Sequence, residues 1–169
     1  MGKTYKKAQS AMEYLMTYGW AILIIAIVLA ALFSLGVFSS SSFLGTTCVA
    51  SSGYLCQSPL LHTGTLTLTF GQSTGTNWGQ SYIAFIQSGA GAPSTSLPAC
   101  GEVSLGTSFA SGQQAQVTIA NTVTNAATPT CTTFSSTVGT SYSGALWVSY
   151  VVNSQTLISQ VATLTLKAS

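Results

Sequence analysis

The chain has 169 residues, only 4% of them charged, and it contains no Asp and no Arg. The formal net charge of +2 comes mostly from the lysines near the start, which excludes a basic surface for nucleic acid. Between Glu13 and Lys167 the only charged residue is Glu102. A surface so poor in charge favours association, so we expect neighbouring subunits, glycans or both to cover it.

The chain begins with a basic head and continues as a long apolar segment. Lys3, Lys6 and Lys7 come first, Glu13 follows, and an uncharged, strongly apolar run continues to Phe38. As a helix rising 1.5 Å per residue, a run of roughly two dozen residues spans a hydrocarbon core. The lysines are expected on the cytoplasmic side, so the C-terminal portion is predicted to lie outside the cell.

Three kinds of N-terminus fit this pattern: a secretory signal that is removed, a permanent anchor, and a leader that is cut before the apolar helix. The apolar stretch is longer than the roughly 7–15 residues of a signal-peptide core, which argues against ordinary secretion. Ala30 and Ala31 nevertheless offer small residues for a cut on its far side.

A short motif favours the third kind. Residues 7–15, Lys-Ala-Gln-Ser-Ala-Met-Glu-Tyr-Leu, resemble the processing site of archaeal type IV pilins. In these class III signal peptides a prepilin peptidase cuts just before the Gln. The resemblance covers roughly residues 1–40, with Ala8 where the pattern often has a Gly. It implies a cut between Ala8 and Gln9, which would remove the three leading lysines.

The resemblance also implies an assembly role for the helix. An acid at the position of Glu13 is thought to pair with the new α-amino group of the cut chain and so to register an incoming subunit. A plain interfacial charge, stabilised by the helix dipole, explains Glu13 equally well. Because the helix is apolar on all sides, it must lie in lipid or in a helical bundle. The residues predicted to serve assembly are Glu13, Tyr14, Leu15, Ile22, Ile25, Leu29 and Leu32.

The chain is expected to form a leader at 1–8, a hydrophobic helix at 9–43 and an extracellular β-domain at 44–169. Thr65 to Phe70 alternates threonine with apolar residues, which predicts a half-buried strand. Further strands are predicted at Ser81 to Gln87, Glu102 to Leu105, Gln116 to Ala120, Ala145 to Val152 and Gln160 to Lys167. The fold class is therefore α+β, with an antiparallel, immunoglobulin-like sandwich after the helix. The segment from Ala145 is apolar on both faces and is the expected central strand.

Four cysteines lie beyond the helix, which suits two disulfides in an external domain. Sequence allows three pairings, and we prefer Cys48 with Cys56 and Cys100 with Cys131, because each pair closes a loop between neighbouring turn-rich segments. A metal site would need short Cys-x-x-Cys pairs or several histidines, and His62 is the only histidine. No cofactor is expected.

The sequence favours a structural protein over an enzyme. The only conceivable catalytic set outside the membrane is a serine with His62 and Glu102, and nothing distinguishes any one serine. We expect a subunit of an archaeal pilus or adhesion filament, a homopolymer on the cell surface that passes through the cytoplasmic membrane before assembly. The resemblance implies a prepilin peptidase, an assembly ATPase and a membrane platform protein as partners. No Asn begins an Asn-x-Ser/Thr acceptor, so glycans would sit on Ser and Thr. The alternatives are a single-pass surface binding protein and, more nearly, an archaellum subunit.

Overall fold

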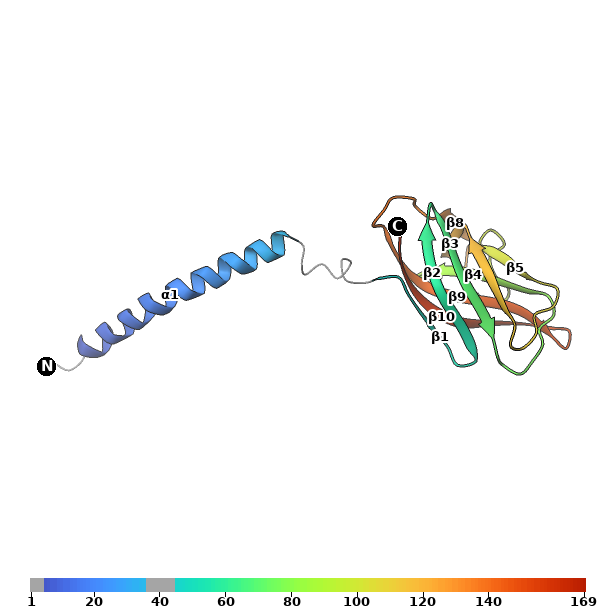
Figure 1. Cartoon of the computed structure of the whole chain (residues 1–169), viewed down its shortest axis with the longest axis horizontal. Helices are drawn as coiled ribbons and strands as arrows, with labels where there is room; N and C mark the ends of the chain where they lie inside the picture. Colours follow the sequence, from blue (N-terminus) through green and yellow to red (C-terminus); the bar gives the residue numbers. More distant parts are fainter. Residues whose placement is uncertain (1–4, 36–44) are drawn as a thin grey trace. The chain divides into compact units, whose positions relative to one another are not determined.

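The computed structural model describes the backbone of residues 5–35 and 45–169 (Figure 1). The chain divides into two compact units, Met1–Phe43 and Leu44–Ser169, and each is described by itself. Side chains are described from Met12 onward, except those of Leu15 and of residues 36–44.

The first unit is one helix, α1 (Tyr5–Ser34). At its end the Leu35 N–H donates a hydrogen bond to the carbonyl oxygen of Ala31 at 2.9 Å. The helix begins four residues before the expected Gln9. Lys6, Lys7 and Ala8 are good helix formers, with no Gly or Pro to stop the helix at the processing site. The expected continuation from 36 to 43 lies outside the described residues.

The second unit is built from strands in two sheets (Figure 1). Its described strands are β1 (Thr47–Ala50), β2 (Tyr54–His62), β3 (Thr65–Gln72), β4 (Ser81–Gln87), β5 (Glu102–Gly106), β6 (Gln114–Ile119), β7 (Asn121–Asn125), β8 (Thr130–Thr133), β9 (Ser141–Val152) and β10 (Gln155–Lys167). All six predicted strands are present. Strands β1, β2, β7 and β8 come in addition.

The larger sheet has seven strands in the order β1-β10-β9-β4-β7-β8, with β5 also paired to β4. Strand β9 lies between β10 and β4, so the segment from Ala145 is a central strand, as its sequence predicts. The expectation of a purely antiparallel fold is wrong at one pair, because β7 runs parallel to β4 where Val123 lies opposite Ile86. The chain makes this crossover by passing through β5 and β6 before it returns to the larger sheet as β7.

The smaller sheet has three antiparallel strands in the order β2-β3-β6. Alternation in β3 places Leu66, Leu68 and Phe70 in the core, while the intervening threonines are half-buried. These side chains pack in one hydrophobic cluster with Phe85 of β4 and Leu146 of β9 from the larger sheet. The two sheets therefore share one core.

The second face of the larger sheet explains why β9 is apolar on both sides. Trp147 of β9 packs against a smaller buried cluster that contains Ile86 of β4 and Val123 of β7. Leu146 and Val148 point to the main core instead. A central strand covered on both faces needs apolar residues at successive positions, and β9 has them.

Candidate functional site

Helix α1 exposes apolar side chains around its whole circumference. Ile22 and Ile25 are 66% and 59% exposed, Leu29 is 43% exposed and Leu32 is half-buried. Successive residues of a helix are 100° apart, so the four consecutive exposed apolar residues from Ile22 to Ile25 leave no polar face. The 23 residues Met12–Ser34 form the one helix, in the part of the chain that the structure describes, that is long and apolar enough to cross a membrane.

The predicted processing and registration residues lie in the first turns of α1. Ala8 and Gln9 are helical, and their side chains, like that of Leu15, lie outside the described residues. Glu13 and Tyr14 are exposed. Thr17 Oγ1 donates to the carbonyl of Glu13 at 3.0 Å, which satisfies the hydroxyl within the helix itself. This bond engages the main-chain carbonyl of Glu13 and not its carboxylate, which belongs to an exposed residue.

The structure contains two disulfides, with the pairing preferred from the sequence. Cys48 of β1 bonds to Cys56 of β2, and this bond joins the larger sheet to the smaller one. Cys100, in the loop before β5, bonds to Cys131 of β8. Both pairs have a Cα–Cα distance of 6.0 Å. Two disulfides, a β-rich unit and an N-terminal apolar helix are compatible with an extracellular protein and with a helix that serves as a membrane anchor or signal.

The residues weighed for catalysis or metal binding are not assembled into a site. His62, at the end of β2, donates from Nδ1 to the carbonyl oxygen of Ser169 at 2.7 Å. Glu102 begins β5, in the other sheet, opposite Ala84. Among the described residues, no group of three His, Cys, Asp or Glu side chains is placed to hold a metal ion.

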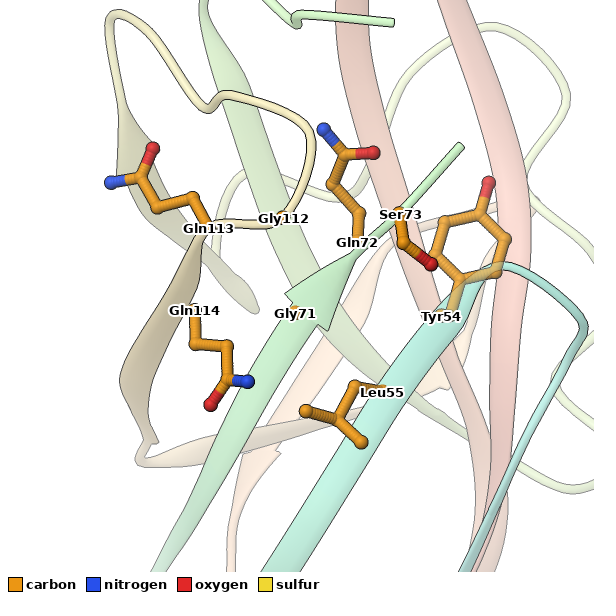
Figure 2. Close-up of a pocket in the computed structure, with 8 residues that line it drawn as sticks. All are labelled: Tyr54, Leu55, Gly71, Gln72, Ser73, Gly112, Gln113 and Gln114. Atoms are coloured by element: carbon orange, nitrogen blue, oxygen red, sulfur yellow. The ribbon is translucent and has the colours of Figure 1, made fainter. Parts of the chain in front are cut away.

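A pocket that the sequence reasoning missed lies over one end of the smaller sheet (Figure 2). Its volume is about 320 Å³, near the lower end of the roughly 300–1,000 Å³ that is usual for small-molecule sites. It is lined by Tyr54, Leu55, Gly71, Gln72, Ser73, Gly112, Gln113 and Gln114. The only sequence signal is the recurrence of Gly and Gln where β3 ends and β6 begins, and no local pattern shows that these two segments meet.

The floor of the pocket is Gly71, which lies between Leu55 of β2 and Gln114 of β6 in the pairing register. A Cβ at this position would lie 3.0 Å from the Gln114 Cγ and 3.2 Å from the Gln113 carbonyl oxygen. Gly71 is buried, and its lack of a side chain lets the Gln114 side chain and the Gln113 backbone close over the middle strand (Figure 2).

The rim of the pocket is fixed by hydrogen bonds to Gln72. Its buried amide donates to the Thr76 carbonyl at 2.9 Å and accepts from the Thr74 hydroxyl at 2.7 Å. Its backbone carbonyl accepts from the Gly112 N–H at 2.7 Å. One buried side chain thus holds the loop after β3, and its backbone holds the loop before β6. The pocket is preformed.

The Tyr54 wall rests on an aromatic cluster. The Tyr54 ring lies 6.3 Å from the Phe70 ring and 6.1 Å from the Trp78 ring, and Trp78 stacks on Tyr150 at 4.2 Å. Burial raises the pKa of the Tyr150 hydroxyl, and the neighbouring Tyr54 adds to this rise through its charge and its hydrogen bond. The cluster fixes the plane of the Tyr54 ring at the pocket edge.

Comparison of this chain with protein-family models, with curated proteins and with solved structures gives no match.

Proposed function

We propose that this chain is a structural subunit of an archaeal type IV pilus or adhesion filament. The apolar helix would form the filament core, and the β-rich unit would form the outer surface. The observation that supports this proposal is the exposed, all-round apolar surface of α1 from Ile22 to Leu29. Such a helix needs lipid before assembly and the helices of other subunits afterwards. The resemblance of residues 7–15 to a pilin processing site supports the same function.

The proposal includes a finer description of the external unit, an immunoglobulin-like sandwich on the filament surface. The three-stranded antiparallel sheet, the core that it shares with the larger sheet and the Cys48–Cys56 bond between the sheets support it. The parallel pair β4–β7 makes this sandwich a variant of the ordinary antiparallel arrangement.

In this proposal the chain enters the cytoplasmic membrane with its β-rich unit outside, and a prepilin peptidase cuts between Ala8 and Gln9. An assembly ATPase and a membrane platform protein then move the subunit into a homopolymer, where Glu13 pairs with the new α-amino group. Exposed Ser and Thr hydroxyls of the β-rich unit serve as glycan acceptors, so the filament is a glycoprotein. No enzyme activity belongs to this function.

The first experiment is mass spectrometry of the N-terminus of the native protein. We expect the mature chain to begin at Gln9 and to keep the apolar helix. A mature N-terminus near Ser34 or Ser39 would indicate ordinary secretion and would remove the basis of the filament proposal.

The second experiment compares the only two acidic residues of the chain, Glu13 and Glu102. Glu13→Gln should lower the yield of shearable surface fibres while processed subunit accumulates in the membrane, because registration is lost and insertion is kept. Glu102→Gln, in the β-rich unit, is the matched control and should leave the yield unchanged. Equal yields from both variants and the parent would contradict the registration role of Glu13.

The second candidate function is a single-pass surface protein whose helix stays in the membrane, and the length of the span Met12–Ser34 favours it. Electron microscopy and sedimentation of sheared surface material separate the two. If the unmodified protein never forms long fibres and stays monomeric in the membrane, the anchored protein replaces the filament. An archaellum subunit is the nearer alternative, and loss of swimming on deletion of the chain would identify it.

A further inference from the structure

We propose that the pocket between Tyr54 and Gln114 binds a neutral saccharide, whether the chain assembles into a filament or remains a membrane-anchored monomer. The pocket lies within the β-rich unit, so sugar binding there can be tested independently of the function proposed for α1.

The chemistry of the lining selects the class of ligand. The eight lining residues include three amide side chains, two hydroxyls, one aliphatic side chain and two glycines, and none of them is charged. A site without Lys, Arg, Asp or Glu has no ion to pair with a phosphate, a carboxylate or an ammonium group. Amides and hydroxyls both donate and accept, so they match the hydroxyl groups of a sugar. The proposed ligand is therefore polar and uncharged.

Two amides in the pocket have hydrogen-bonding capacity to spare. Within the described residues, the Gln114 side chain has no hydrogen-bond partner, and it lies over the buried Gly71 at the edge of the pocket (Figure 2). The Gln113 Oε1 accepts from the Ala110 N–H at 2.9 Å, which holds the side chain in place and leaves its NH₂ group to donate. A ligand in the pocket can thus receive hydrogen bonds from one fixed amide, Gln113, and one adjustable amide, Gln114.

The apolar part of a sugar also has a place in this pocket. The Tyr54 ring stands on the side opposite Gln113 and Gln114 in Figure 2, and Leu55 lies next to Gly71 on the neighbouring strand. A pyranose ring carries hydroxyls at its edge and C–H groups on its faces, so one face can lie against an aromatic ring while the edge meets the amides. Because Phe70 and Trp78 already hold Tyr54, little ordering is needed on binding.

The experiment uses the full chain in nanodiscs or in a zwitterionic detergent, because glucoside and maltoside detergents carry competing sugar headgroups. Cellobiose, maltose, lactose and mannobiose are the neutral probes, and a glucuronic-acid disaccharide is the charged probe. Backbone amide shifts of Gly71, Ser73 and Gly112 are followed by NMR at millimolar probe concentration. We expect at least one neutral disaccharide to shift these amides and the charged disaccharide to leave them unchanged.

A matched pair of variants locates the binding to the pocket. Gln114→Ala removes a lining amide, and Gln116→Ala removes the next outward-facing amide of the same strand, which does not line the pocket. Neither change breaks a hydrogen bond within the described structure. Loss of one neutral hydrogen bond should weaken binding about two- to tenfold in Gln114→Ala, and Gln116→Ala should bind like the parent. The proposal is overturned if no neutral probe shifts the pocket amides, if the charged probe binds as well, or if both variants lose affinity equally.

Discussion

Removing the two disulfides one at a time should destabilise the β-rich unit unequally, with the larger loss at the longer loop. Cys48 and Cys56 are separated by 8 residues, and Cys100 and Cys131 by 31. In the chain-entropy model, closing these loops contributes about 2.5 and about 3.7 kcal/mol, respectively, to the free energy of unfolding at 25 °C. Replacing both members of a pair by Ala should therefore cost about 1.2 kcal/mol more for the second pair.

Urea unfolding of the full chain in a Trp20→Phe background measures this difference. That change removes the tryptophan of α1, so the fluorescence comes from Trp78 and Trp147 of the β-rich unit. With slopes of about 1–3 kcal/mol per molar urea, the two variants should differ in midpoint by about 0.4–1.2 M. Under reducing conditions the parent and both variants should converge, because no cross-link remains in any of them.

The opposite ranking would refute the reasoning. The short-loop pair joins the two sheets, whereas Cys100 and Cys131 join a loop to a strand of the larger sheet. If loss of the Cys48–Cys56 bond costs as much as loss of the other bond, or more, the bond acts mainly by holding the sheets together in the folded state. Restriction of the unfolded chain would then not be its main effect.

Two further predictions concern the core. Gly144→Ala should destabilise the unit by about 1–3 kcal/mol, because a Cβ there would clash with the Ile86 carbonyl oxygen and with the Phe85 ring. In the control Gly45→Ala, the new Cβ meets no atom within 4 Å, so this change should be neutral. Equal urea midpoints for these two variants would contradict the packing of β9 on β4. Burial, aided by Tyr54, raises the pKa of Tyr150 above its ordinary value of 10.0, so its contribution to stability is complete below that pH and is lost as the pH rises through the native pKa. Urea midpoints should therefore fall more steeply above pH 10.0 in the parent than in Tyr150→Phe, and parallel profiles would show that Tyr150 does not titrate as described.

The strands that the sequence predicts are those with a local signal. Thr65 to Phe70 alternates between threonine and apolar residues, and Ala145 to Val152 is almost continuously apolar. Each pattern can be recognised from the residues of the strand alone. Strand β2 escaped prediction because Pro59 interrupts it at an irregularity where Ser58 has a φ of 49°. Strands β7 and β8 are rich in Asn and Thr, and their strand structure depends on pairing with each other and with β4.

The candidate sites also divide into those with a local sequence signal and one without. The apolar helix is predictable because its composition alone shows that it must be surrounded by lipid or by other helices. The disulfide partners could be guessed because each pair closes a loop between neighbouring segments. The pocket could not, because it arises where Leu55, Gly71 and Gln114 align across three strands, and this register depends on contacts between segments distant in sequence.

The scarcity of charge has a consequence for the surroundings that the β-rich unit tolerates. Acid unfolds proteins mainly by protonating carboxylates that the folded state keeps ionised, and by charging buried histidines. Residues 44–169 contain a single side-chain carboxylate, Glu102, and a single histidine, His62, which is exposed. The apolar core, the sheet hydrogen bonds and the two disulfides do not titrate in acid. Acidification and changes in salt concentration therefore have almost no group to act on, and the unit should keep its fold across a wide range of external acidity and salinity.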